Sequence, residues 1–508
     1  MLKDKAKTVD FELEEVQHRI DDLKDESDSP PTSSTDLDDE IDPAYLPKER
    51  LFLSVYSINQ LYPGICLGFV EGSLPILLVK NGAKLSDLGF LSLCSYPFGL
   101  KFLFGPLLDR YFSERVGKRM SYILPCLSTI LLLSFLSAFS IDQWIQSVNL
   151  SPLSLVSFFM LLASAILMIT SDGYLITTVA RNRRSLMPML KFSAQNIGRF
   201  LTYNLFIPLS SVKFCNDYIF STPHDEPLVS FQALFILLAA GTFFYVLYLS
   251  FCSVKEPPTR QNFESLFEII KMIRGFWTNK NLFRFLVFGI IWKLGFAPLD
   301  NYLLPACIRG GFSEADFINI QTMLFPVSII AACLAGNYAV KGTQNQFRLF
   351  YAHIVAKIAT SLLSYWVLVE YGTPQGWQNA FWAMTLVQAL DIIQEALLFT
   401  STGAFYARIC DQKIGTTFLT VIFSVNNLGT SLPKTLMYYI LTDDNWKGVT
   451  YFFWVYAIVI LFVIIPEARR LSTLPLEEYS LHSAEGGNFI SRGENRGQAI
   501  ELKSLEDL

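Results

Sequence analysis

Charged side chains inside apolar stretches are the feature of this sequence best suited to chemistry. An ionised group at membrane depth is costly, so it usually faces an interior pathway and either pairs with another group or binds a solute. Cations that meet in one cavity would suit an anionic solute bearing phosphates or carboxylates. The alternative is internal pairing that locks helices together, for example Lys293 with Asp300. Glu71 with Lys101 is a second such pair. The charged residues in apolar stretches are Glu71, Lys101, Asp172, Arg199, Lys293, Asp300, Lys357, Asp391, Glu395 and Lys434.

Two of these carboxylates, Asp391 and Glu395, stand four positions apart and therefore share one face of a helix. Neighbouring carboxylates in a low-dielectric site can share a proton, because two negative charges together are unfavourable there. We predict that these two groups, with Asp172 and Glu71, couple proton binding to function. A polar patch lining a water-filled cavity is the alternative. Lys434 lies near the end of its apolar stretch, where a long side chain can reach the membrane interface.

The composition identifies the elements that must position these groups. The chain has 508 residues, of which 52% are hydrophobic and only 17% charged. Soluble proteins carry about 25% charged residues, and a helix of roughly 20 apolar residues spans a bilayer. We therefore predict an all-α membrane protein with 12 spans. They lie at about 51–79, 87–108, 120–140, 153–179, 187–211, 229–252, 282–304, 315–339, 347–369, 377–406, 414–440 and 449–466.

The charge distribution along the chain predicts its orientation. Lysine and arginine concentrate in the loops after even-numbered spans, and such loops face the cytosol. Both termini are then cytosolic, which agrees with an even number of spans. The start of the chain has no signal-peptide pattern of basic, apolar and cleavage regions. The predicted organisation is an acidic disordered tail (1–49), six spans (50–252), an amphipathic cytosolic connector (253–281), six more spans (282–466) and a polar cytosolic tail (467–508).

A glycine and an Asp-Arg pair, followed by a Gly-Lys-Arg turn, separate the second and third spans. This pattern resembles the loop between the second and third helices of major facilitator transporters. Two six-helix halves joined by a long connector are also the layout of that fold, in which the halves rock around a site near the bilayer midplane. The resemblance implies a gating role for this loop. Its residues are Gly105, Asp109, Arg110, Gly117, Lys118 and Arg119.

Further motifs are collinear with one branch of that superfamily over residues of about 50–440. They include Gly72-Ser73-Leu74-Pro75, Pro97-Phe98, Asp172-Gly173, Phe214-Cys215-Asn216, Gly415-Thr416 and Asn427-Leu428-Gly429. They resemble the acetyl-coenzyme A transporter family, which supplies the lumen of the endoplasmic reticulum and has a bacterial relative that moves muropeptides with protons. This chain differs from the family pattern in having Leu167-Met168 before Asp172, and in the charges of Glu71, Asp391 and Glu395.

The resemblance implies transport of acetyl-CoA, a CoA-type organic anion, across the endoplasmic reticulum membrane. Its phosphates would be bound by cations and its adenine by an aromatic face. Aromatic side chains, Trp292 among them, are also common at helix packing faces. The predicted substrate-binding residues are Lys101, Arg199, Lys293, Lys357, Tyr96, Asn196 and Asn427.

Other classes of function are less favoured by the sequence. The eight cysteines form no metal-binding pattern, and the four histidines are dispersed, so we expect no metal, no cofactor and no enzymatic activity. No feature suggests nucleic-acid binding. Cys215 and Cys307 fall in loops on the same predicted side, where a disulfide could form. Two rival functions remain: a proton-coupled symporter of another organic anion or peptide-like solute, and a non-transporting membrane scaffold or receptor.

Overall fold

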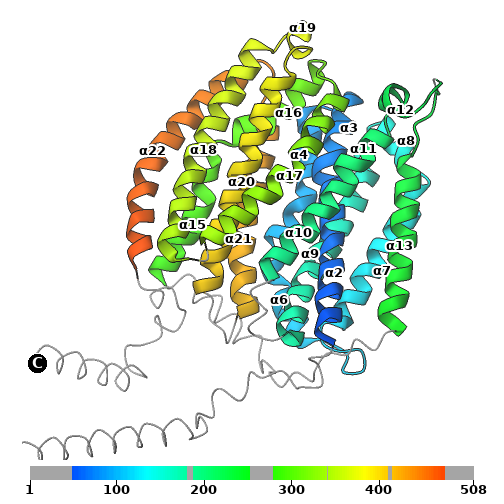
Figure 1. Ribbon diagram of the computed structural model, residues 1–508, viewed down its shortest axis with the longest axis vertical. Helices are drawn as coiled ribbons and strands as arrows, with labels where there is room; N and C mark the ends of the chain where they lie inside the picture. The colour runs from blue at the N-terminus through cyan, green and yellow to red at the C-terminus, as the bar shows by residue number, and fades with distance from the viewer. Residues whose placement is uncertain are drawn as a thin grey trace, which may run out of the picture.

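The computed structural model describes residues 48–179, 187–222, 224–251, 279–339, 341–409 and 415–474. Within these ranges the chain is almost entirely helical and contains no strand (Figure 1). In this described part, nine helices are long and apolar enough to cross a membrane. The prediction of an all-α membrane protein is therefore confirmed. The predicted acidic tail, the connector and most of the C-terminal tail lie outside the described residues.

The N-terminal helices span residues 49–251 and form one group in Figure 1. Several are assembled from short α, 3-10 and π segments rather than from one uninterrupted helix. They are α2 (Glu49–Leu67), η2 (Gly68–Ser73), α3 (Leu74–Lys80), α4 (Leu85–Ser92), η3 (Leu93–Ser95), α5 (Tyr96–Gly99), η4 (Lys101–Leu103), α6 (Gly105–Arg110), α7 (Met120–Ala138), α8 (Ile141–Gln146), α9 (Leu150–Thr178), α10 (Met187–Arg199), η6 (Phe200–Leu205), α11 (Phe206–Leu209), α12 (Val212–Tyr218) and α13 (Phe231–Phe251).

The C-terminal helices span residues 280–473 and are longer and more regular. Helix α22 continues through Pro466, where the predicted sixth span of this half ends, and stops at Thr473. The extension is held by Arg470, whose guanidinium pairs with Glu467 at 2.7 Å. The group comprises α15 (Lys280–Leu294), α16 (Ala297–Arg309), α17 (Glu314–Ala339), α18 (Thr343–Glu370), α19 (Pro374–Trp377), α20 (Phe381–Ile409), α21 (Gly415–Ile440) and α22 (Trp446–Thr473).

Three predicted spans are not among the nine long apolar helices, although each is helical. The second consists of α4 to α6 and is divided because Pro97 and Pro106 have no N–H to donate to a continuous helix. The fifth, α10 to α11, is interrupted by a π-helical segment. The eleventh is the single helix α21, which carries Asn426, Asn427 and Lys434.

The two groups of helices pack along one another. Helix α2 packs against α9 and α10 in the first group, and α20 packs against α17 and α18 in the second. We call the end where α2 begins and α22 ends the terminal face, and the opposite end, with α8, α12 and α19, the distal face (Figure 1). Toward the distal face the groups meet where α3 packs on α16, α11 on α17 and α4 on α21. Helix α21 also contacts the broken second span along η4 and α6.

Candidate functional site

Lys101 lies where the second span is broken between two helical segments. It belongs to the 3-10 segment η4 and is only 4% exposed. Its ammonium Nζ lies 5.5 Å from the centre of the Phe423 ring, on α21. The Nζ of Lys191, on α10, lies 5.7 Å from the same ring. Cations from two N-terminal spans thus meet one aromatic ring of the C-terminal group, an arrangement that the ring's negative face favours.

Asp172 is the most heavily bonded carboxylate among the N-terminal helices. Its Oδ1 accepts hydrogen bonds from Tyr56 Oη at 3.0 Å and Gln60 Nε2 at 2.9 Å. Its Oδ2 pairs with Lys191 Nζ at 2.6 Å. Gln195 extends the network by donating to Gln60 Oε1 at 3.0 Å. This predicted proton-coupling residue therefore ties α2, α9 and α10 together.

A second charged cluster lies among the C-terminal helices and centres on Lys357. Its Nζ lies 2.8 Å from Asp300 Oδ1 and 3.7 Å from Asp391 Oδ1. The lysine side chain is 10% exposed, whereas the two carboxylates are 35% and 42% exposed. Gln394 Nε2 donates to Asp391 Oδ1 at 2.8 Å, and the charge of Glu395 also acts on Lys357. The structure thus joins predicted substrate-binding and proton-coupling residues in one cluster and assigns Asp300 to Lys357, not to Lys293.

Lys293 is held by neutral partners. Its Nζ donates to Asn426 Oδ1 at 2.9 Å, to the Asn426 carbonyl at 3.3 Å and to Thr430 Oγ1 at 3.0 Å. Ion pairs of 4.0 Å or less join Lys357 and Lys191 to carboxylates. Within the described ranges, no such pair involves Lys101, Arg199 or Lys293. These three cations retain the capacity to pair with an added anion.

Glu71 and Arg199 lie at two π-helical segments that pack against each other. Glu71 belongs to η2, and Arg199 directly precedes η6. Ser73 Oγ, in η2, donates to the Thr202 carbonyl at 3.1 Å and joins the segments. The charges of Lys434 and Arg199 act on Glu71. No ion pair of 4.0 Å or less joins Glu71 to Lys101 among the described residues. Single-turn π segments inside α-helices occur frequently at functional sites.

The other predicted substrate-binding residues lie near the same spans but differ in their contacts. Asn427 Nδ2 donates to the Phe98 carbonyl at 3.1 Å, so it holds α21 against the broken second span. Asn196 Nδ2 is buried and has no hydrogen-bond partner in the described part of the chain. Tyr96 is half-buried at the start of α5.

The loop motif contacts the helix that carries Asp172. Gly105 begins α6, while the side chains of Asp109 and Arg110 lie outside what the structure describes. Gly117 has φ of +105°, a conformation that favours glycine. Lys118 and Arg119 are buried, at 8% and 7% exposure. The Arg119 guanidinium lies against Gly173, where an added Cβ would come within 2.6 Å of its Nε.

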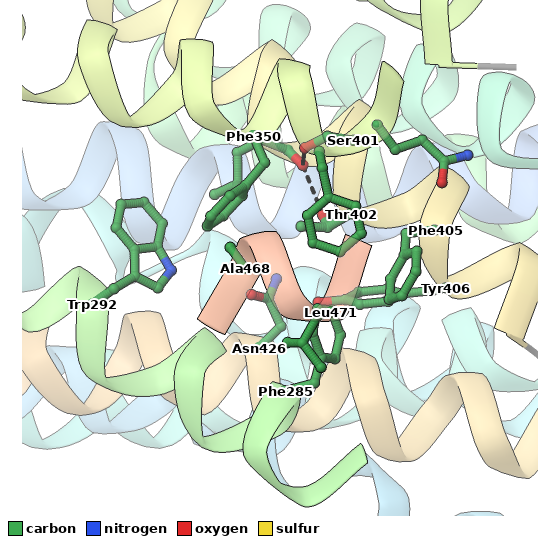
Figure 2. A pocket seen from close by; sticks show the side chains of 13 residues that line it. Phe285, Trp292, Phe350, Ser401, Thr402, Phe405, Tyr406, Asn426, Ala468 and Leu471 are labelled. Carbon is green, nitrogen blue, oxygen red and sulfur yellow. Dashed lines mark hydrogen bonds between the residues drawn. The ribbon is translucent and has the colours of Figure 1, made fainter. Parts of the chain in front are cut away.

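A pocket lies among the C-terminal helices toward the terminal face (Figure 2). Asn426, the partner of Lys293, is among its lining residues and lies beside the pocket in Figure 2. Aromatic rings from α15, α18 and α20 supply half of the remaining lining residues. They are Phe285, Trp292, Phe347, Phe350, Phe405 and Tyr406.

The cysteines contribute no cross-link and no metal site in the part of the chain that the structure describes. Cys215 and Cys307 are free, fully buried thiols, so the disulfide considered from the sequence is absent. No group of three or more potential metal-ligating side chains occurs among the described residues.

Comparison with known proteins identifies the chain's family. A family model described as acetyl-coenzyme A transporter 1 matches residues 51–281 and 311–451. The chain belongs to this family. An uncharacterised protein of Schizosaccharomyces pombe is 25% identical over 392 residues, which cover 76% of this chain and 73% of that protein. The anhydromuropeptide permease of Escherichia coli K12 is 21% identical over 371 residues, 72% of this chain and 66% of the permease.

Solved structures place this family member in the major facilitator fold. The crystal structure of a D-xylose-proton symporter superposes with a TM-score of 0.56 at 13% identity. The match covers 82% of this chain and 97% of the symporter. At this identity the likeness shows the fold alone. The chain is therefore a multipass membrane transporter of the major facilitator type, and the resemblance deduced from its motifs is confirmed.

Some residues of this family member's charged network were not among the site residues predicted from the sequence. Lys191 follows a basic loop and reads as an ordinary cytosolic flank, yet it pairs with Asp172. Tyr56 and Gln60 stand four positions apart in an apolar helix, a spacing that could have predicted a shared polar face. Asn426 directly precedes the family motif that begins at Asn427 and is not part of it. Lys293 contacts Asn426, not its neighbour.

Proposed function

We propose that the chain moves acetyl-CoA across the endoplasmic reticulum membrane by alternating access. The matched family is described as acetyl-coenzyme A transporter 1, which supports this cargo. The lysine- and arginine-rich loops after even-numbered spans support cytosolic termini. The terminal face would then be cytosolic and the distal face lumenal.

The observation that carries the proposal is a set of three cations that form no ion pair of 4.0 Å or less with a carboxylate among the described residues. Lys101, Arg199 and Lys293 come from three different spans. Acetyl-CoA carries several phosphate charges, and each would gain a charge-assisted hydrogen bond from a lysine or arginine. Lys293 is especially suited because its present partners, Asn426 and Thr430, are neutral. An arriving phosphate would not have to displace a carboxylate.

The transport test uses purified full-length protein in liposomes and labelled acetyl-CoA. A hydrogen bond to a charged group contributes about 1.5–3 kcal/mol, equivalent to roughly 10- to 150-fold in affinity. We therefore expect Lys293→Ala and Lys101→Ala each to reduce uptake at low acetyl-CoA concentration by at least about tenfold. Lys280→Ala is the matched control, since this exposed lysine begins the helix that contains Lys293. Wild-type uptake no better than that of a neutral sugar would refute the cargo.

Proton coupling is the second part of the proposal and rests on the cluster around Lys357. Asp300 and Asp391 share this lysine, and Glu395 lies within its electrostatic reach. A proton that binds one carboxylate would weaken the electrostatic attraction between that group and Lys357. The contacts between α16, α18 and α20 would change as a result. The variant with Asp391→Asn and Glu395→Gln should transport without responding to an imposed pH gradient. A full gradient response in that variant would remove both residues from the coupling mechanism.

The rival functions give different results in related assays. Competition of labelled uptake by CoA esters, nucleotides and peptides distinguishes acetyl-CoA from another organic anion or a peptide-like solute. Deleting residues 1–45 distinguishes a transporter from a scaffold that recruits partners through its acidic tail. We expect uptake per folded molecule to survive that deletion.

A further inference from the structure

The pocket among the C-terminal helices is lined by aromatic rings and uncharged polar side chains. We propose that it binds a planar, amino-substituted ring, the adenine of the CoA-type cargo. This inference rests on the proposed function, because it assigns one end of that cargo to a site. The phosphates would lie at Lys293, and the base would lie farther toward the terminal face.

The aromatic wall suits a flat ring. Phe285 packs against Phe405 with ring centres 5.0 Å apart and against Tyr406 at 5.8 Å. Phe347 meets Phe405 at 5.3 Å. These rings come from three helices and lie close together at the wall of the pocket. Aromatic surfaces of this kind stack on nucleobases, because every base presents a π-face.

Three polar side chains that line the pocket have oxygen atoms that can accept hydrogen bonds. Gln346 is 2% exposed, and its Oε1 is buried without a hydrogen-bond partner in the described part of the chain. Its Nε2 is already used, donating to the Ala339 carbonyl at 3.1 Å. Ser401 and Thr402 both donate to the Leu398 carbonyl, at 3.0 Å and 2.7 Å, which leaves their oxygens as acceptors. A ligand with N–H donors would complete this set, and the exocyclic amine of adenine supplies two.

The position of Asn426 connects the pocket to the charged site. Asn426 lines the pocket and accepts a hydrogen bond from Lys293 Nζ at 2.9 Å. Gln346 stands near the start of α18, whereas Asn426 stands well inside α21, which also begins at the terminal face. At 1.5 Å per residue, the two side chains are on the order of 10 Å apart along the bundle. The pocket is thus elongated, with an acceptor near its outer end and a cation beside its inner end, as a nucleotide requires.

Binding measurements on the purified full-length protein test the assignment. Calorimetric titration would use adenosine 3′,5′-bisphosphate, its inosine counterpart and acetyl-phosphopantetheine. Inosine replaces the amine of adenine with a carbonyl, which would face the acceptors Gln346, Ser401 and Thr402. We expect the adenosine compound to bind at least about tenfold more tightly than the inosine compound, equivalent to 1.4 kcal/mol.

Two variants keep the test independent of a folding defect. Gln346→Leu and Thr402→Val should each reduce the adenosine-to-inosine ratio toward one, while leaving acetyl-phosphopantetheine binding within about twofold. Trp382→Ala is the aromatic control, because this side chain is 74% exposed on the outside of α20. It should leave all three affinities unchanged.

The outcomes separate this inference from the proposed function. Equal binding of the adenosine and inosine compounds by the wild-type protein would overturn the pocket assignment, even if acetyl-CoA is transported. Displacement of a bound fatty acid without any nucleotide binding would also overturn it, assigning the pocket to a lipid chain. Adenosine-selective binding that is lost in Gln346→Leu would support the pocket, even if uptake assays refute acetyl-CoA as cargo.

Discussion

Replacing Lys357 by methionine tests how the carboxylates of the C-terminal cluster are held. Methionine has nearly the same length but no charge, so Asp300 and Asp391 would lose the ammonium that lies 2.8 Å and 3.7 Å away. Removing one partner of a fully buried ion pair costs about 3–5 kcal/mol, whereas exposed pairs contribute about 1 kcal/mol or less. The lysine is 10% exposed but its two partners are 35% and 42% exposed. We therefore expect a loss of about 2–3 kcal/mol of unfolding free energy, between those limits.

The assay is equilibrium unfolding of the purified protein in mixed detergent micelles by increasing dodecyl sulfate. Lys357→Met would be measured beside Asp300→Asn and the double variant. Because the double variant leaves fewer unpaired charges, it should be more stable than the sum of the single effects predicts, by about 1 kcal/mol or more. Lys447→Met, at an exposed lysine in the first turn of α22, is the control. Strictly additive effects would show that Lys357 and Asp300 do not stabilise one another and would refute the reasoning.

Three other perturbations test particular contacts. Asp172→Asn should lower the thermal unfolding temperature more than Tyr56→Phe, because it removes the charge paired with Lys191 at 2.6 Å rather than one of several hydrogen bonds. Gly173→Ala should slow uptake without preventing folding, since the new methyl must displace Arg119; an unchanged rate would show that the loop adjusts freely. Gly117→Ala should cost about 1–2 kcal/mol in the same micelle assay, because φ is +105°, and no loss would contradict that backbone conformation.

The positions of the helices could be predicted largely from the sequence. A membrane span must satisfy its backbone polar groups internally, so long apolar stretches become helices regardless of their neighbours. Helix α9, for example, occupies Leu150–Thr178, close to the predicted span at 153–179. Local chemistry also explains the broken second span, because Pro97 and Pro106 interrupt its hydrogen bonding. The π-helical segments at Glu71 and beside Arg199 could not be foreseen, since their altered turn depends on packing between α2 and α10.

The sequence by itself determined that charges stand inside a helical membrane protein, and its motifs indicated the family. Only the tertiary structure decided which charges meet. Asp300 pairs with Lys357, 57 positions away, although Lys293 is nearer in sequence. The physical reason is that an ion pair depends on a separation of a few ångströms in space, and the packing of α16 against α18 sets that distance. The same packing leaves Lys293 with neutral partners and brings the aromatic residues of three helices around one pocket.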